Sequence, residues 1–351
     1  MQSADDRPRV LREWIIRLML IAASCVVAVV LAEVVSRIFF PISDGLDNIT
    51  LDGKPVKGWF EPGSVYRQVS NEYDALTTIT DKGHRVPGVE GNPDIIFIGD
   101  SFTYGFGLTD DETFPSIYCT QQHHDCVNLG WPGSGTLRQV TRLETFIRDW
   151  NWKPREVKLF FFGMSTSFSS GNDFVDNYNS HTHEPPMRPV DDKEQKQLPK
   201  AESTIGMGER IIGLQVFVLN HSTLMRLVKY YWGPLLKSLI VADPGERMTV
   251  ALAATEQYLR QLDQLSRQVG FEYNIYLLVP VHDIIRGTHS DTLEALNHVS
   301  PKRVIATAHL FRDSPQKYYY AFDGHLNPAG SRRVAEFLIS QERTHTSRVR
   351  D

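Results

Sequence analysis

The stretch Ile95-Ile96-Phe97-Ile98-Gly99-Asp100-Ser101-Phe102-Thr103 decides the fold of this chain. Four consecutive apolar residues predict a strand buried on both faces, and they end abruptly in Gly-Asp-Ser. Ser101 would therefore stand at the carboxyl end of a buried strand, which is where open α/β sheets bind their ligands. A competing interpretation gives Ser101 only the role of a helix cap, because serine is common at that position.

A second polar motif lies far downstream, at Phe322-Asp323-Gly324-His325-Leu326-Asn327-Pro328. A serine after an early strand and an Asp-x-His near the carboxyl terminus together favour a Ser-His-Asp arrangement for nucleophilic catalysis. His325 would accept the proton of Ser101, and Asp323 would orient the imidazole. Alternatively the motif only starts a helix, with Asn327 as N-cap and Pro328 as first residue, but Asp323 and His325 would then have no role.

Four separated blocks, taken together and in this order, resemble the SGNH/GDSL hydrolase family. The resemblance extends from about Asp94 to the helix that follows Pro328. The blocks are the serine block Gly99–Thr103, a glycine block within Asn128–Thr136, the asparagine block Gly171-Asn172-Asp173 and the histidine block Asp323-Gly324-His325.

The resemblance implies both a catalytic triad and an oxyanion hole. The triad would be Ser101 as nucleophile, His325 as base and then acid, and Asp323 as the orienting carboxylate. The oxyanion hole would consist of the backbone N–H groups of Ser101 and Gly133 and the side-chain amide of Asn172. In the glycine block Gly133 fits best and Gly130 is the alternative. The resemblance also implies a flavodoxin-like three-layer α/β sandwich around a central parallel sheet.

Two departures from the family pattern are visible. One residue separates Asp323 from His325, whereas the family pattern is usually Asp-x-x-His, with two residues between them. Some members that act on polysaccharide acetyl groups are similar to the shorter Asp-x-His form seen here. In addition, residues 164–171 intervene between the predicted strand 157–162 and Asn172. Either a loop bulges out there and returns, or the asparagine role is lost. We expect the loop, because the Gly-Asn-Asp block is otherwise intact.

The amino-terminal segment predicts a membrane anchor. Leu18–Ala32 is an unbroken run of apolar or small residues, and it is preceded by Arg7, Arg9, Arg12 and Arg17. The positive-inside rule then places residues 1–14 in the cytoplasm, and residues 15–40 provide enough helix to cross the bilayer. Three alternatives compete: a signal-peptidase site at 30–32, a lipoprotein-like box at 22–25, and a buried core helix.

The cysteines agree with export. Cys25 lies in the apolar run, which leaves Cys119 and Cys126 as an even pair and predicts a small-loop disulfide, with two unpaired thiols as the alternative. His123-His124 lies between them, but a Cys-x6-Cys spacing lacks the paired ligand units of zinc sites. We expect no metal there and no cofactor for the proposed chemistry.

The remaining chain predicts one α/β domain of residues 92–351, preceded by a linker of residues 41–91 with short extended pieces. Strands are expected at 95–98, 127–129, 157–162, 273–281 and 304–310, with helices after Ser101, at 137–150 and at 328–340. An insertion at about 179–245 would either pack on the sheet or form a cap over the site. The net charge of −5 is spread along the 351 residues without a basic stripe, which argues against nucleic-acid binding.

These observations favour a serine esterase in the bacterial inner membrane, crossing it once, with its catalytic domain in the periplasm. The family resemblance and the exported location suggest that it acts on O-acetyl esters of an envelope carbohydrate. Three alternatives stay open: a polysaccharide O-acetyltransferase with the same triad, a lipase or thioesterase, and a catalytically silent carbohydrate-binding scaffold. The natural ester and the protein partners are not specified by the sequence.

Overall fold

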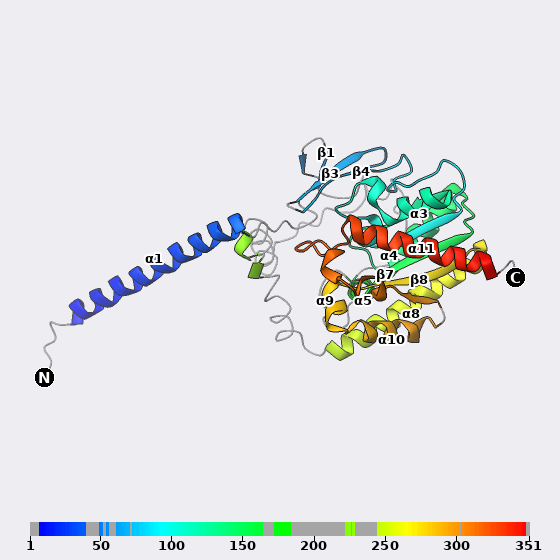
Figure 1. Ribbon diagram of the computed structural model, residues 1–351. Coiled ribbons are helices and arrows are strands. Elements are labelled where there is room, and N and C mark those ends of the chain that lie inside the picture. Colours follow the sequence, from blue (N-terminus) through cyan, green and yellow to red (C-terminus); the bar gives the residue numbers. More distant parts are fainter. Residues whose placement is uncertain are drawn as a thin grey trace, which may run out of the picture. The chain divides into compact units, whose positions relative to one another are not determined.

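The computed structural model describes residues 7–39, 49–51, 54–55, 61–70, 72–163, 172–183, 222–225, 227–228, 244–301 and 303–348 (Figure 1). The chain divides into two units. One unit comprises Met1–Ile42 and Ala201–Leu236, and the other comprises Ser43–Lys200 and Lys237–Asp351. The loop expected at 164–171 and most of the insertion expected at about 179–245 lie outside the described residues.

The first unit contains α1 (Arg7–Phe39). Its Arg12–Phe39 part is long and apolar enough to cross a membrane, a test that a signal sequence near the amino terminus also meets. Glu33 is the acidic residue within the predicted span of residues 15–40. Its carboxylate accepts hydrogen bonds from Ser222 Oγ (2.7 Å) and from the backbone N–H groups of Thr223 and Leu224 (both 3.0 Å). These contacts compensate a carboxylate that would be costly in an apolar segment.

The second unit is built on a five-stranded parallel sheet with the order β6-β5-β7-β8-β9. β5 lies between β6 and β7, and every one of its residues is buried, as its continuous apolar sequence predicts. Aromatic rings of neighbouring strands stack, with 6.3 Å between the ring centroids of Phe97 and Phe160 and 4.8 Å between those of Phe160 and Tyr276. The strands are β5 (Ile95–Gly99), β6 (Cys126–Asn128), β7 (Glu156–Phe162), β8 (Glu272–Leu278) and β9 (Val304–Ala306).

Helices cover both faces of this sheet. In Figure 1, α3 (Phe114–Gln122) and α11 (Pro328–Arg348) lie on one side of β7 and β8, and α8 (Pro244–Val269) and α10 (His289–Val299) lie on the other. Two more helices, α4 (Thr136–Trp150) and α5 (Asp173–His183), pack against α8. The three-layer α/β sandwich expected from the sequence is therefore confirmed.

The strand order creates a switch point beside β5. The chain passes from β5 to the edge strand β6 and then returns across β5 to β7. Ligands of open α/β sheets bind at such points, beyond the carboxyl ends of the strands. Ser101 follows β5 directly, and the described chain resumes after β7 at Asn172.

Several elements end at other residues than the sequence predicts. The strand expected at 273–281 ends at Leu278, and Pro280 caps α9 (Val281–Arg286), because proline lacks the N–H that would continue the ladder. The strand expected at 304–310 is short, and the chain turns into a 3₁₀ helix (Ala308–Phe311). The closing helix α11 continues to Arg348. Two further short 3₁₀ helices span Asp110–Glu112 and Pro315–Lys317.

The segment expected to be a linker contributes a four-stranded antiparallel sheet. Its order is β2-β1-β3-β4, and its strands are β1 (Ile49–Leu51), β2 (Lys54–Pro55), β3 (Val65–Val69) and β4 (Asp74–Thr78). Tyr66 on β3 and Tyr73 before β4 pack in a small apolar cluster with Tyr104, Phe106 and Tyr320 of the α/β domain. The extended pieces expected in this segment are thus paired with one another and packed onto the domain.

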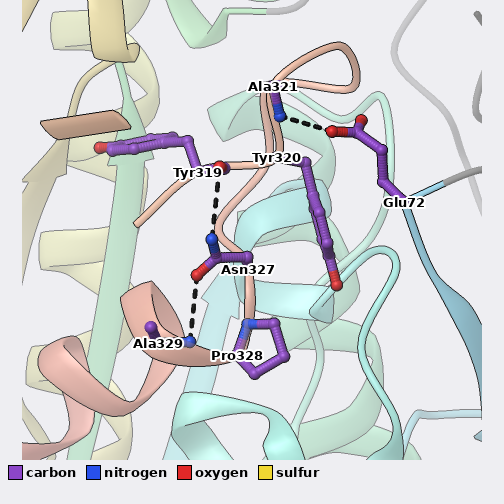
Figure 2. A pocket seen from close by; sticks show the side chains of 7 residues that line it. All are labelled: Glu72, Tyr319, Tyr320, Ala321, Asn327, Pro328 and Ala329. Carbon is purple, nitrogen blue, oxygen red and sulfur yellow. Dashed lines mark hydrogen bonds between the residues drawn. The ribbon is translucent and has the colours of Figure 1, made fainter. Parts of the chain in front are cut away.

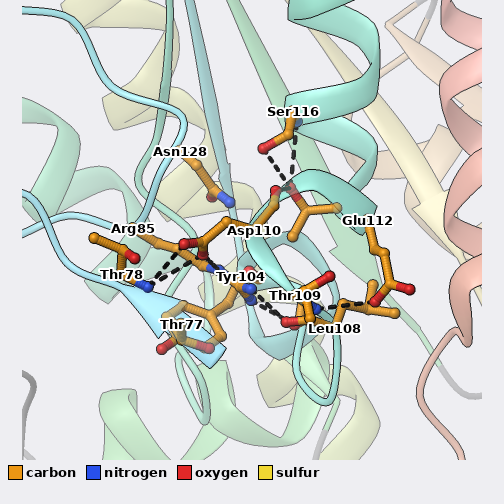
Figure 3. Close-up of polar contacts among 12 residues, drawn as sticks. Thr77, Thr78, Arg85, Tyr104, Leu108, Thr109, Asp110, Glu112, Ser116 and Asn128 are labelled. Carbon is orange, nitrogen blue, oxygen red and sulfur yellow. Dashed lines mark hydrogen bonds and ion pairs between the residues drawn. The ribbon is translucent and has the colours of Figure 1, made fainter. Parts of the chain in front are cut away.

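Arg85 connects this segment to the element that carries Ser101. Its guanidinium is completely buried and donates hydrogen bonds to the carbonyl oxygens of Tyr104, Gly105 and Leu108 (Figure 3). Asp110 lies 3.4 Å from Arg85 Nε and accepts hydrogen bonds from the Thr78 N–H at 3.1 Å. A charge this deeply buried is tolerated because several oxygen acceptors and one carboxylate surround it.

Cys119 at the end of α3 and Cys126 on β6 form a disulfide with a Cα–Cα distance of 6.1 Å, the pair suggested by the sequence. Replacing both cysteines by serine is expected to lower the free energy of unfolding by about 2–3 kcal/mol, because the cross-link restricts a short loop in the unfolded chain. Urea denaturation of the full chain in detergent would measure this difference, with Cys25→Ser as the matched control. Equal midpoints, or two alkylatable thiols in the native protein besides Cys25, would contradict the expectation.

Candidate active site

Ser101 is the first residue of α2 (Ser101–Tyr104), the short helix that follows β5. Asp100 is the N-cap, since its side chain accepts a hydrogen bond from the Phe102 N–H at 2.9 Å. The competing interpretation, in which the Ser101 hydroxyl serves as the helix cap, is therefore replaced by capping through Asp100. The hydroxyl of Ser101 faces His325 instead.

Asp323 and His325 lie on the loop that precedes α11. Ser101 Oγ is 2.7 Å from His325 Nε2, and the opposite ring nitrogen of His325 contacts Asp323 Oδ1. The backbone N–H of His325 also donates to Asp323 Oδ1, at 3.3 Å. The structure thus brings together three residues that are up to 224 positions apart in sequence, in the geometry of a serine, its base and an orienting carboxylate.

The helix start predicted for the same motif is also present. Asn327 Oδ1 accepts hydrogen bonds from the N–H groups of Ala329 (3.0 Å) and Gly330 (3.1 Å), which caps α11. Its amide donates to the carbonyl oxygens of Lys317 and Tyr319. Asn327 therefore fixes the loop, while Asp323 and His325 remain directed at Ser101.

The electrostatics of the pair favour an ionised Asp323. Burial alone would raise the pKa of Asp323, but the charge and hydrogen bonds of His325 and the hydroxyl of Tyr73 hold it below its usual value. Burial alone would lower the pKa of His325, but the Asp323 carboxylate, with a smaller contribution from Asp100, raises it above 6.5. A raised imidazole pKa makes His325 a stronger base toward the serine proton.

Two aromatic rings enclose the imidazole of His325. The ring centroids of Phe102 and Phe106 lie 4.8 and 5.1 Å from that of His325. Phe102 is itself stacked on Phe162 at the end of β7, with 4.3 Å between centroids. The imidazole is therefore held by packing as well as by hydrogen bonds, which limits the orientations that it can adopt.

The glycine block contains two glycines with different roles. A Cβ atom on Gly130 would lie 2.3 Å from the backbone nitrogen of Tyr104, so this glycine permits close approach to α2. Its N–H donates to Asn128 Oδ1 at 2.9 Å. Gly133 has a positive φ of 70° and open space around its Cβ position. Since the Gly130 N–H is already engaged, Gly133 remains the better candidate for an oxyanion donor.

Asn172 is buried at the amino-terminal end of α5. Its Oδ1 accepts a hydrogen bond from the Val175 N–H at 3.0 Å, which caps this helix. The neighbouring Asp173 accepts hydrogen bonds from the Phe162 N–H (2.7 Å) and from Gln139 Nε2 (2.8 Å). Asp173 thus ties the start of α5 to the end of β7 and to α4. Asn172 is therefore adjacent to a residue that contacts the carboxyl end of β7.

The structure adds two residues to the site that the sequence does not single out. Tyr73 donates its hydroxyl hydrogen to Asp323 Oδ2 at 3.0 Å. Glu72 accepts hydrogen bonds from the N–H groups of Ala321, Phe322 and Asp323, and Figure 2 shows the first of these contacts. A pocket of about 570 Å³ lies on this side of the loop and is lined by Glu72, Tyr319, Tyr320, Ala321, Asn327, Pro328 and Ala329.

Two other histidines of the described chain contact carboxylates outside this arrangement. His124 Nε2 is 2.7 Å from Glu342 Oε1, so this histidine joins the β6 side of the domain to α11. His282 lies 3.6 Å from Asp283 at the start of α9. Within the described ranges, the side chains form no group of three or more metal-binding residues.

The fold and this arrangement define a class: an α/β domain with a Ser-His-Asp constellation at the switch point of its sheet. No family model matches the sequence, and no curated protein matches it. Three similar solved structures cover 70–72% of this chain. One is a member of the lipolytic protein G-D-S-L family from Veillonella parvula DSM 2008, with 14% identity, a TM-score of 0.39 and 96% of that chain covered. Another is the psychrotrophic esterase EstA from Pseudoalteromonas sp., with 10% identity, a TM-score of 0.38 and 98% of that chain covered. The third is a catalytic mutant of Axe2, an acetylxylan esterase from Geobacillus stearothermophilus, with 14% identity, a TM-score of 0.37 and 95% of that chain covered.

The TM-scores of these three structures lie below 0.5 and their identities are 14% or less. The chemistry of this chain follows from the geometry of its own residues.

Proposed function

We propose that this protein is a serine ester hydrolase in which Ser101, His325 and Asp323 act as the catalytic triad. The observation that carries the proposal is the continuous contact from Ser101 Oγ through both ring nitrogens of His325 to Asp323. The raised pKa of His325 and the lowered pKa of Asp323 fit the roles of base and orienting carboxylate.

In the first half of the proposed reaction, Ser101 Oγ forms a bond to the ester carbonyl carbon while its proton passes to His325 Nε2. The carbonyl oxygen becomes an oxyanion, which the N–H groups of Ser101 and Gly133 and the amide of Asn172 would stabilise. The C–O bond to the alcohol then breaks, and His325 gives its proton to the leaving oxygen. The product is an acyl ester of Ser101.

In the second half, water attacks the acyl carbon and gives a proton to His325. The bond to Ser101 Oγ breaks, the carboxylic acid leaves, and Oγ recovers its proton from His325. If a sugar hydroxyl replaced water in this half, the same residues would transfer the acyl group. The two reactions therefore share the site and differ in the acceptor.

We further propose that the substrate is an O-acetyl ester of an envelope carbohydrate and that α1 anchors the domain outside the cytoplasm. The resemblance of the four sequence blocks supports the substrate class. The arginines before the apolar run and the disulfide between Cys119 and Cys126 support the location, because positive charges stay inside and disulfides persist in oxidising compartments.

The experiment that tests this function compares acyl esters of increasing chain length with the full chain in detergent. We expect Ser101-dependent hydrolysis of p-nitrophenyl acetate and of acetylated xylan, with weaker turnover of the octanoyl ester. A preference for the long chain would favour a lipase or thioesterase, and acetyl transfer to an added oligosaccharide would favour a transferase. If the wild-type protein showed no turnover that depends on Ser101, the proposal would be overturned and the scaffold alternative would remain.

The pH dependence of this activity follows from His325. The base must be neutral to accept the proton, and the pKa of His325 lies above 6.5. We therefore expect kcat/KM for p-nitrophenyl acetate to rise with pH through a midpoint above 6.5 and then level off. Asp323, whose pKa lies below 3.8, stays ionised throughout this range. A midpoint below 6.5, or a flat profile, would be inconsistent with His325 as the base.

A further inference from the structure

A hairpin outside the α/β domain reaches the loop that carries Asp323 and His325. The chain between β3 and β4 brings Glu72 and Tyr73 against residues 321–323, about 250 positions away in sequence. We propose that Tyr73 is a positioning residue of the active site, which acts through Asp323 on His325. This inference rests on the proposed triad and goes beyond it, because it connects the turn between β3 and β4 to the catalytic carboxylate.

The two oxygens of Asp323 have different partners. Oδ1 accepts from the ring and the backbone N–H of His325, and Oδ2 accepts from the hydroxyl of Tyr73 at 3.0 Å. The Asp323 side chain is only 5% exposed, so little water can replace either partner. With both oxygens engaged, rotation of the carboxylate would break a hydrogen bond to a charged group, which is among the more costly hydrogen bonds to lose.

Tyr73 is itself rigidly placed. It is 7% exposed, and its ring lies edge-on to Phe106, with 6.2 Å between centroids, and 5.1 Å from Tyr320. Burial, together with the negative charge of Asp323, raises the pKa of Tyr73 above its ordinary value. The hydroxyl therefore keeps its proton and acts only as a donor to Asp323.

Glu72 holds the backbone of the same loop. Its carboxylate accepts from the N–H group of Ala321 at 2.6 Å (Figure 2). It also accepts from the N–H groups of Phe322 (3.1 Å) and Asp323 (2.9 Å). Adjacent residues of the hairpin thus fix both the main chain and the side chain of the catalytic carboxylate. Such a supporting set of contacts is what keeps a catalytic geometry within the tolerance that the reaction requires.

The test is Tyr73→Phe, which removes the hydroxyl and keeps the ring. Asp323 and Asp100 raise the pKa of His325, and His325 and Tyr73 lower that of Asp323. The Glu72 carboxylate and the Tyr320 hydroxyl are further ionisable groups beside Asp323, and Tyr73→Phe leaves both in place. Without the Tyr73 hydrogen bond, more negative charge remains for His325, so its pKa rises. We expect kcat for p-nitrophenyl acetate to fall by about 10-fold with KM unchanged within about two-fold, and the acid limb of kcat/KM to move to higher pH.

Tyr66→Phe is the matched control. Tyr66 belongs to the same sheet and the same apolar cluster, is fully buried, and accepts a hydrogen bond from the Glu61 N–H at 2.6 Å, away from the catalytic loop. Both variants are expected to unfold near the wild-type temperature, with only Tyr73→Phe changing kcat and the pH midpoint.

The outcomes separate the inference from the proposed function. Suppose that wild-type turnover depends on Ser101 but Tyr73→Phe leaves kcat and the pH midpoint unaltered. This result would overturn the role of Tyr73 and leave the triad intact. Equal losses in both variants without a pH shift would reduce Tyr73 to a packing residue and overturn the inference as well. Absence of Ser101-dependent turnover in the wild-type protein would overturn both.

Discussion

Replacing His325 by glutamine is expected to lower kcat for p-nitrophenyl acetate by about 10⁴-fold or more, the loss typical of a triad member. Glutamine can still form a hydrogen bond with Ser101, but it cannot accept the serine proton and return it to the leaving group. Asp323→Asn should have an effect of similar size, because an asparagine amide would favour the wrong imidazole tautomer. Initial rates of the purified full-length variants would measure both losses.

A suitable control for this substitution is His124→Gln. His124 is also partly buried and also contacts a carboxylate, that of Glu342, but it lies on the β6 side of the domain. Its variant should keep wild-type kcat. A His325→Gln protein with more than a tenth of wild-type activity would remove His325 from the role of base, whatever its distance from Ser101.

Replacing Asn172 by serine is the second change with a large expected effect. Serine can still cap α5 through its hydroxyl, as Asn172 now does through Oδ1, but it lacks the amide donor. We expect kcat to fall by about 100- to 1000-fold with KM little changed, since an oxyanion donor acts mainly in the transition state.

The control compares this variant with Asn172→Ala, which removes both cap and donor. The alanine variant should lose the same activity and, in addition, about 1 kcal/mol of stability from the missing cap. If Asn172→Ser retained wild-type kcat, the asparagine block would serve only to start α5. The oxyanion would then depend on the backbone N–H groups alone.

The central sheet could be predicted from the sequence because its strands have a simple pattern. β5 and the last four residues of β7 (Leu159–Phe162) are continuously apolar, a pattern typical of parallel strands covered on both faces. The serine and histidine blocks could be predicted for a different reason. The order of short motifs fixes which loops meet at the carboxyl edge of the sheet, so the contact between Ser101 and His325 needs no knowledge of side-chain packing.

The amino-terminal sheet could not be predicted in the same way. In β3, Val65 and Val69 are exposed, whereas Gln68 is fully buried. Gln68 is satisfied by Thr77 Oγ1 (2.9 Å) and by the N–H of Gly107 (2.7 Å). The apolar residues Val65 and Val69 would therefore predict the wrong buried face of β3. Gln68 is buried instead, because its long-range hydrogen bonds satisfy its polar atoms.

The roles of Tyr73, Glu72 and Arg85 could not be predicted from the sequence for a related reason. Each forms hydrogen bonds with a segment remote in the chain, and two of the three bind main-chain atoms. Because nearly every residue has a backbone carbonyl and N–H group, the sequence does not indicate which of these groups a side chain binds. Arg85 is one of two arginines in residues 41–91, and nothing in the sequence indicates that it is the buried one. Only the three-dimensional arrangement shows which acceptors it has.

The measurement that tests the triad most directly is the rate of phosphonylation by a fluorophosphonate, followed by peptide mapping. An ordinary serine hydroxyl reacts negligibly with this reagent, whereas one activated by a histidine base is modified and releases fluoride. We expect label on the peptide that contains Ser101, no label at that site in Ser101→Ala, and a strongly reduced rate in His325→Gln. Absence of label from Ser101, or an equal rate in His325→Gln, would contradict the proposal that His325 activates Ser101.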